Sequence, residues 1–135
     1  MKPLQQAGPP ISILIAEDEE LVRKFLGSAI PYRFPDIAIH FAENGRIGME
    51  LFIEHTPDIV ITDINMPEMD GIQMAGKIKS IKADTKIIVI TANCDTSYME
   101  KFNEIGCEDY LLKPITFSKL FAAIDRCIAG ITLER

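Results

Sequence analysis

Short apolar runs recur along the chain, and stretches with a helical spacing of apolar residues separate them. Runs that are rich in β-branched residues and lack polar alternation are typical of parallel strands that are buried on both faces. The predicted strands are Ile11–Ala16, Ile37–Ala42, Ile59–Asp63, Lys86–Thr91 and Asp109–Leu112.

Apolar residues between these strands recur at steps of three and four, which is the spacing of an amphipathic helix. The first helix is expected to end at Ile30, because Pro31 and Pro35 favour a loop. Thr116 is the expected N-cap of the last helix. The predicted helices are Glu19–Ile30, Gly45–Glu54, Gly71–Ile81, Ser97–Ile105 and Phe117–Ile128.

Strands that alternate with helices predict a doubly wound α/β fold, in which helices cover both faces of a five-stranded parallel sheet. The expected strand order of this flavodoxin-like (βα)5 arrangement is 2-1-3-4-5, with ligands bound outside the carboxyl ends of the first and third strands. Residues 11–130 are predicted to form one domain. Residues 1–10 would be a flexible leader and residues 131–135 a C-terminal tail.

Composition excludes several classes of function. The net charge of −6 and the pI of about 4.9 come without a basic patch, so we expect no direct binding of nucleic acid. No apolar stretch is long enough to span a bilayer, and Met1–Pro10 lacks the pattern of a signal peptide. We therefore expect a cytoplasmic protein that does not bind membranes.

The cysteines Cys94, Cys107 and Cys127 are odd in number, widely spaced and without a CxxC pair. This spacing supports neither a zinc site nor a disulfide framework. We interpret them as reduced thiols that pack as small apolar residues.

Charged side chains follow three of the predicted strands. Glu17 and Asp18 follow the first strand, Asp63 ends the third, and Lys113 follows the fifth. Each alone is typical of a solvated turn or a helix start, but a parallel sheet would bring them to one edge. Clustered carboxylates need a cation, and Mg²⁺ prefers oxygen ligands. With Lys113 opposite to hold an anion, the pattern predicts a metal-dependent site where an aspartate accepts a phosphoryl group.

Four motifs carry a resemblance to a known family: ILIAEDEE, DIVITDINMPEMDG, IIVITA and DYLLKP. In this order and at this spacing, they resemble the response-regulator receiver domain of bacterial two-component signalling, of the CheY-like kind. The resemblance covers about residues 11–130. It implies that a sensor histidine kinase donates a phosphoryl group to this domain.

The resemblance also implies a role for each matching position of the metal site. Glu17 and Asp18 would be the acidic pair, with Asp18 the more direct Mg²⁺ ligand. Asp63 would accept the phosphoryl group and bind the metal, and Asn65 would offer its backbone carbonyl to the metal.

The remaining matching positions would serve the bound phosphoryl group and the switch. Thr91 and Lys113 would each bind a phosphoryl oxygen, and Pro114 would follow a cis peptide bond. Tyr110 would be the aromatic switch that turns inward when Thr91 moves. The surface formed by the fourth helix, the fifth strand and the fifth helix would then bind a partner, with an activation-linked dimer as one further option.

Asn65 and Asn93 would border the path of the water that hydrolyses the acyl phosphate. Both are small and neutral, so we expect neither strong shielding nor a charged group that orients water. The phosphoryl lifetime stays open.

Three other interpretations fit the sequence less well. Haloacid-dehalogenase-type phosphatases use a D-x-D motif, but Asn65 stands at the second aspartate position. A nucleotide or flavin binder would be expected to carry a glycine-rich phosphate loop, and none is present. A degenerate receiver would lack site residues that are intact here. His40 and His55 are interpreted as ordinary surface or strand histidines.

Whether the chain is a stand-alone receiver or part of a longer protein, and which effector or output domain it serves, stays open.

Overall fold

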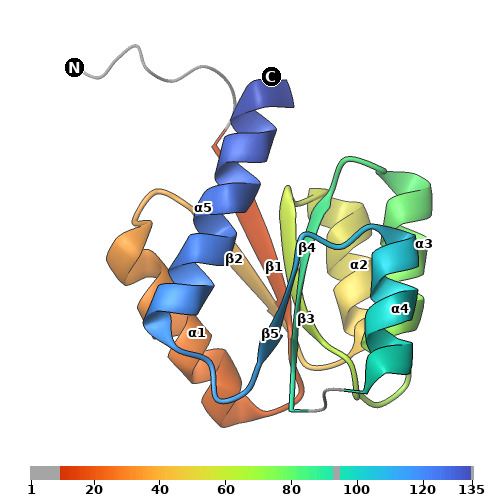
Figure 1. Cartoon of the computed structure of the whole chain (residues 1–135). Helices are drawn as coiled ribbons and strands as arrows, with labels where there is room; N and C mark the ends of the chain where they lie inside the picture. Colours follow the sequence, from red (N-terminus) through yellow and green to blue (C-terminus); the bar gives the residue numbers. More distant parts are fainter. Residues whose placement is uncertain (1–9, 93–94, 135) are drawn as a thin grey trace.

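The computed structural model describes residues 10–92 and 95–134. Its strands form one parallel sheet in the order β2-β1-β3-β4-β5, and the helices lie on both faces (Figure 1). The predicted flavodoxin-like α/β fold is therefore confirmed. The strands are β1 (Ser12–Ala16), β2 (Ala38–Ala42), β3 (Ile59–Asp63), β4 (Lys86–Thr91) and β5 (Asp109–Leu112). The helices are α1 (Glu20–Arg33), α2 (Gly45–His55), α3 (Gly71–Ile81), α4 (Thr96–Ile105) and α5 (Phe117–Glu134).

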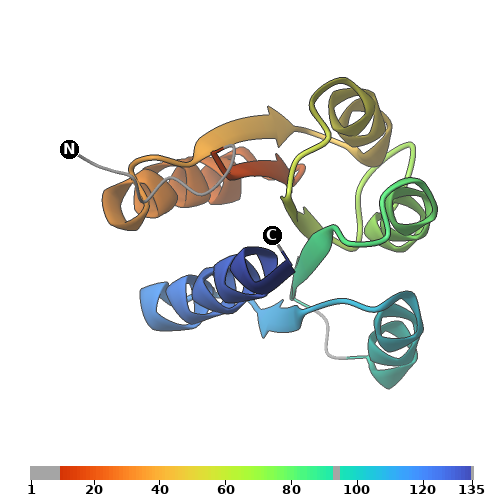
Figure 2. The same ribbon diagram turned by 90° about the horizontal axis from the view of Figure 1, so that it is seen from above.

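The sheet separates two apolar cores. Figure 2 shows α1 and α5 on one face, and α2, α3 and α4 on the other. Alternate residues of one strand serve the two cores: Ile13 and Ile15 pack in the cluster beneath α1 and α5, whereas Leu14 packs in the cluster beneath the other helices. This alternation is the period of a strand. Because helices and apolar side chains cover both faces of the sheet, the central strands need no polar face, which explains their continuous apolar runs.

The first helix continues past its predicted end. Pro31 lies inside α1, which ends at Arg33 rather than at Ile30. Proline in the last turn removes one donor, but the backbone N–H of Phe34 still donates to the carbonyl of Ile30 at 2.7 Å. Both of these side chains are buried in the core. Their burial holds the last turn together in spite of the proline.

The last helix is also longer than predicted. It runs to Glu134 instead of Ile128, and so includes residues 131–134 of the predicted tail. Ile131 is buried in the core beneath α1 and α5, and Lys86 on β4 binds the Glu134 carboxylate at 2.7 Å. Core packing and this ion pair extend the helix. At its start, the Thr116 hydroxyl accepts the backbone N–H of Lys119 at 3.3 Å, as an N-cap does.

Two thiols and two imidazoles lie outside the sheet edge predicted to be functional. Cys107 and Cys127 are free, and burial raises the pKa of each thiol to about 12. Cys94 lies outside the described residues. The imidazole of His40 on β2 stacks on that of His55 at the end of α2, with ring centroids 4.0 Å apart. Among the described residues, none of the helices combines the length and apolar character that a membrane crossing requires.

Candidate phosphoacceptor site

Three carboxylates gather at the carboxyl edge of the sheet. The strands β1 and β3 are neighbours, and Ala16 pairs with Thr62 in their register. The chain therefore emerges from both strands side by side, and each of Glu17, Asp18 and Asp63 offers an oxygen within 4.8 Å of the others. Glu17 and Asp63 are buried, whereas Asp18 is exposed. The predicted convergence of these acids is what the fold produces.

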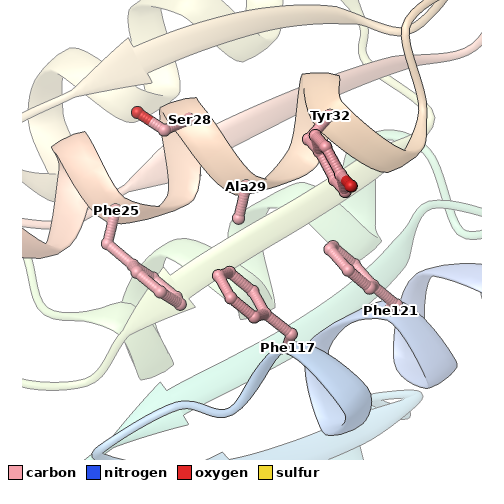
Figure 3. Close-up of a pocket in the computed structure, with 6 residues that line it drawn as sticks. All are labelled: Phe25, Ser28, Ala29, Tyr32, Phe117 and Phe121. Carbon is pink, nitrogen blue, oxygen red and sulfur yellow. The ribbon is translucent and has the colours of Figure 1, made fainter.

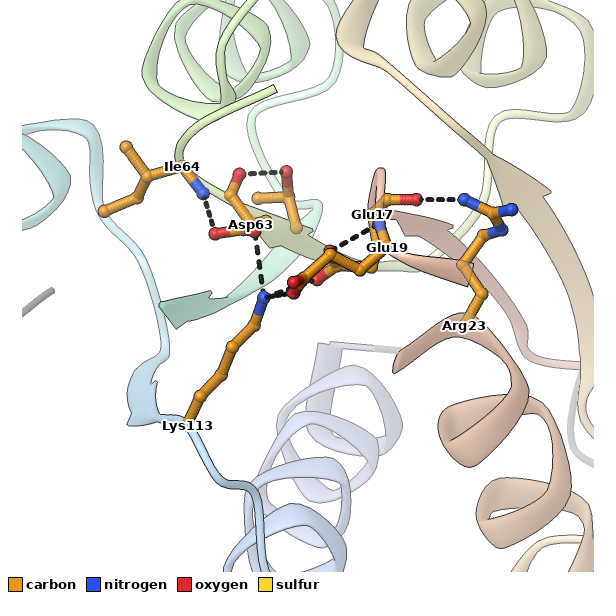
Figure 4. A network of polar contacts seen from close by, with 7 residues as sticks. Glu17, Glu19, Arg23, Asp63, Ile64 and Lys113 are labelled. Atoms are coloured by element: carbon orange, nitrogen blue, oxygen red, sulfur yellow. Dashed lines mark hydrogen bonds and ion pairs between the residues drawn. The ribbon is translucent and has the colours of Figure 1, made fainter. Parts of the chain in front are cut away.

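Lys113 reaches into this cluster from the loop between β5 and α5 (Figure 4). Its Nζ lies 3.0 Å from Oδ2 of Asp63, 3.1 Å from Oε1 of Glu17 and 2.8 Å from Oε1 of Glu19. Its backbone N–H donates to the carbonyl of Thr91 at 2.8 Å, which fixes the start of the loop against β4. The Lys113–Pro114 peptide bond is cis. Lys113 thus places one ammonium group among three carboxylates.

Burial governs the charge of Glu17. Its side chain is fully enclosed, and this burial raises the pKa of Glu17 to about 7, although a hydrogen bond from the backbone N–H of Glu19 opposes the rise. The negative charge of Asp63 raises it further. Oε1 of Glu17 is buried and accepts no well-formed hydrogen bond from any described residue, despite the nearby ammonium of Lys113. A buried carboxylate oxygen in this state is ready for a cation.

The charge of Lys113 is stabilised by its neighbours. Burial alone would disfavour the ammonium, but the hydrogen bonds to Glu19 and Asp63, and the negative charge of Asp63, together raise the pKa of Lys113 above its usual value. The side chain is therefore a permanent cation at the site.

The two oxygens of Asp63 have different partners. Oδ1 accepts the backbone N–H of Ile64 at 2.7 Å, and Oδ2 faces Lys113. The loop that follows is drawn back over the strand end, because the backbone N–H of Gly71 donates to the carbonyl of Ile64 at 2.8 Å. A Cβ at Gly71 would overlap the backbone oxygen of Asp63. Glycine at this position is what allows α3 to start so close to the backbone of Asp63.

These residues fit a hard divalent cation. Mg²⁺ is held by one or two carboxylates together with carbonyls, waters and phosphate oxygens. The cluster of Glu17, Asp18 and Asp63 offers hard oxygen ligands only, and one buried oxygen of Glu17 lacks a hydrogen bond. The cluster could therefore bind a metal ion.

The structure also shows where the other predicted site residues lie. Thr91 ends β4 and is buried, and its neighbour Ile90 pairs with Asp63 in the sheet register. Asn65 is exposed, two residues beyond Asp63. Tyr110 lies on β5 and packs edge-on against Phe102 of α4, with ring centroids 6.2 Å apart. Asn93, the second residue predicted to border the water path, lies outside the described residues.

Sequence reasoning missed Glu19. The residue precedes α1 as its N-cap, yet its side chain makes no capping hydrogen bond and instead reaches Lys113. Its acidic neighbours in ILIAEDEE were visible in the sequence, but the direction of an exposed side chain was not.

A second feature that sequence reasoning missed is an apolar groove between α1 and α5. Figure 3 shows aromatic rings of both helices facing one another there. Phe117 stacks between Phe25 and Phe121, with ring centroids 5.4 and 5.7 Å apart, and Ser28, Ala29 and Tyr32 complete the lining. Phe117 remains 57% exposed. Phe25, Phe117 and Phe121 each belong to a predicted helix stripe, but their meeting depends on how the two helices pack.

Comparison with known proteins identifies the class. The family profile described as "Response regulator receiver domain" matches residues 13–125. Chemotaxis protein CheY of Bacillus subtilis is 33% identical over 116 residues, which cover 86% of this chain and 96% of that protein. Among solved structures, the N-terminal domain of an uncharacterized protein from Wolinella succinogenes superposes with a TM-score of 0.85 at 34% identity, covering 93% of this chain and 99% of that one.

Other relatives are longer proteins. The regulatory protein AtoC of Escherichia coli is 34% identical over 86% of this chain, which spans 25% of AtoC. Transcriptional regulatory protein PdtaR of Mycobacterium tuberculosis is 37% identical over 91% of this chain, which spans 59% of PdtaR.

The family match makes this domain a signalling module rather than a classical enzyme, and the cluster of Glu17, Asp18 and Asp63 is consistent with the phosphoacceptor site of such a module. This chain belongs to the response regulator receiver domain family, of the CheY-like kind. Membership implies two-component signalling and a histidine kinase partner.

Proposed function

We propose that this domain accepts a phosphoryl group on Asp63 from the phosphohistidine of a sensor histidine kinase, in a reaction that depends on Mg²⁺. The observation that carries the proposal is the position of Asp63. Its carboxylate is buried at the carboxyl edge of the sheet, within reach of two further acids and 3.0 Å from the Lys113 ammonium. We infer that the reaction takes place in the cytoplasm, where ATP-dependent kinases supply the phosphohistidine.

The transfer is an in-line substitution at phosphorus. One carboxylate oxygen of Asp63 forms a bond to phosphorus while the bond from phosphorus to the kinase imidazole nitrogen breaks. The imidazole leaves with the bonding electron pair and, with a proton taken from solvent, becomes the neutral ring. The products are the aspartyl phosphate and the unphosphorylated histidine side chain of the kinase. Since the reactants are already activated, catalysis consists mainly of positioning and charge neutralisation.

Residues of this chain supply most of that environment. Lys113 would neutralise one phosphoryl oxygen, and the hydroxyl of Thr91 would donate to another. Glu17, Asp18, Asp63 and the backbone carbonyl of Asn65 would hold Mg²⁺, which neutralises phosphoryl charge when bound. Ile64 already orients Asp63 through its backbone N–H. Asp63 and Lys113 thus already lie beside each other at the place where the anion would bind.

The bound phosphoryl group would then shift an equilibrium between two arrangements of the surface formed by α4, β5 and α5. Thr91 would move toward the phosphoryl group, and Tyr110 would turn inward from its place against Phe102. A ligand can shift such an equilibrium only by its differential affinity for the two states. A downstream effector, an output domain or a second copy of the domain would bind the altered surface.

A phosphatase of the haloacid-dehalogenase type is the rival with similar chemistry. It would need an acid two residues after the phosphoacceptor, where this chain has Asn65. The amide cannot protonate a leaving group, so steady turnover of phosphate esters is not expected.

The experiment that tests the proposal locates the acceptor. Borohydride reduces an aspartyl phosphate to homoserine, so the phosphorylated protein is reduced, digested and analysed by tandem mass spectrometry. We expect homoserine at position 63 alone. Homoserine at 18 or 58, or none in a protein shown to carry phosphate, would contradict the assignment.

A further inference from the structure

Carboxylates crowd the ammonium of Lys113 and would compete with an incoming anion for it. An ammonium carries three N–H groups, and three carboxylates surround this one: Glu19 at 2.8 Å, Asp63 at 3.0 Å and Glu17 at 3.1 Å. Lys113 donates hydrogen bonds to Glu19 and Asp63 and forms an ion pair with Glu17, so a phosphoryl oxygen must compete with these carboxylates for the ammonium.

The three carboxylates differ in how easily they leave. Glu17 is fully buried, and moving it would strand a charge away from water. Asp63 is the acceptor and must stay. The side chain of Glu19 is 60% exposed, so water replaces the ammonium at little cost when it swings out. Glu19 is the partner that the anion would displace.

The local structure explains why Glu19 points inward. As the N-cap of α1, it holds an extended backbone conformation, and its own N–H donates to Oε2 of Glu17 at 3.0 Å. Its side chain caps no helix N–H and reaches across to the β5–α5 loop instead, as Figure 4 shows.

We propose that Glu19 is a releasable competitor for Lys113, which occupies the lysine in the resting protein and slows phosphorylation of Asp63. This role rests on the proposed function, because it presumes that Lys113 binds a phosphoryl oxygen. It makes Glu19 a positioning residue that acts through Lys113. The rate at which Asp63 is phosphorylated would thus depend on a side chain that is neither the acceptor nor a metal ligand.

A neighbouring residue supplies a matched control. Glu20 follows directly in the sequence, is exposed, and pairs with Lys24 at 3.4 Å instead of with Lys113. Glu19→Gln and Glu20→Gln change the net charge equally, at adjacent positions. Any effect of overall charge on an anionic phosphodonor appears in both variants, whereas release of Lys113 appears only in the first.

The experiment measures the initial rate of phosphorylation by acetyl phosphate with Mg²⁺, by intact mass. We expect Glu19→Gln to raise the apparent second-order rate constant about two- to fivefold, the size of an exposed ion pair, and Glu20→Gln to stay within about twofold of wild type. The beryllofluoride concentration at half-saturation, followed by fluorine NMR, should fall by the same factor. Equal rates in the two variants, or no increase in Glu19→Gln, would overturn the proposal. If the wild type gained no phosphate and bound no beryllofluoride, the proposed function itself would fail instead.

A second readout needs neither metal nor phosphodonor. Proton–nitrogen NMR of lysine ammonium groups should show a slowly exchanging Lys113 signal in the wild type, assigned by its loss in Lys113→Arg. We expect this signal to broaden or shift in Glu19→Gln and to stay unchanged in Glu20→Gln. An identical Lys113 signal in the wild type, Glu19→Gln and Glu20→Gln would show that the contact with Glu19 does not hold Lys113, and would overturn the proposal.

Discussion

The ammonium of Lys113 lies 3.0 Å from Oδ2 of Asp63, although 50 positions separate the two residues in the sequence. Parallel strands bring them together: β4 lies between β3 and β5, and the backbone of Lys113 is hydrogen bonded to that of Thr91 at the end of β4. The contact places a permanent cation beside the proposed acceptor. Our account of phosphoryl transfer depends on it.

Gly71 is required for the close approach of α3 to Asp63. Gly71→Ala would drive a methyl group into the Asp63 carbonyl oxygen, so we expect a loss of about 1–3 kcal/mol in the free energy of unfolding. Urea unfolding measures it. Gly76→Ala is the control, because Gly76 lies in the same helix and a Cβ there would meet no atom within 4 Å. It should stabilise the protein by about 0.5–1 kcal/mol. Similar destabilisation by both would refute the steric argument.

Mg²⁺ should stabilise the folded domain through the acidic cluster. A ligand that binds only the folded state at about 100 times its Kd adds about 2.7 kcal/mol to the free energy of unfolding. Thermal unfolding with and without Mg²⁺ measures this gain. Asp18→Asn should remove most of it, whereas Asp36→Asn, an exposed aspartate outside the cluster, should retain it. A full Mg²⁺ gain in Asp18→Asn would exclude Asp18 as a ligand.

The stacked imidazoles should make stability depend on pH. Burial, and then the charge of His55, lower the pKa of His40, while Glu54 opposes them. The unfolded chain then binds a proton more readily than the folded one, so this contribution is complete above about pH 6.5 and is lost as the pH falls through the lower folded pKa. His40→Gln should lose less stability than wild type between about pH 8 and pH 5. Parallel curves for the two proteins would contradict the assignment.

Tyr110 should couple the site to the surface formed by α4, β5 and α5. Beryllofluoride with Mg²⁺ should change amide hydrogen exchange in α4 and β5 of the wild type. Tyr110→Phe keeps the ring that packs on Phe102 and should respond similarly, whereas Tyr110→Ala should bind the anion without the change in exchange. Tyr32→Ala, at an exposed tyrosine on α1, is the control. A normal response in Tyr110→Ala would rule out the aromatic switch.

The sequence was sufficient for the topology, because the features that define it are local. Continuous apolar runs such as Ile87–Ile90 are intelligible only as strands covered on both faces, and the alternation with helices then leaves few arrangements. The convergence of Glu17, Asp18 and Asp63 follows from that topology, since all three succeed or end neighbouring strands.

What could not be predicted depends on tertiary contacts. Pro31 stops an isolated helix, but Ile30 and Phe34 are buried and hold the last turn of α1. Ile131 extends α5 for the same reason. The inward reach of Glu19 and the meeting of Phe25 with Phe117 depend on how separate elements pack, which no local pattern encodes.

The most direct test of the account is the intact mass after incubation with acetyl phosphate and Mg²⁺, for the wild type and for Asp63→Asn. We predict the addition of one phosphoryl group to the wild type, its absence in Asp63→Asn, and its loss when EDTA removes the metal. An adduct of equal yield in Asp63→Asn, or a wild type that neither gains phosphate nor binds beryllofluoride, would contradict the claim that Asp63 is a metal-dependent phosphoacceptor.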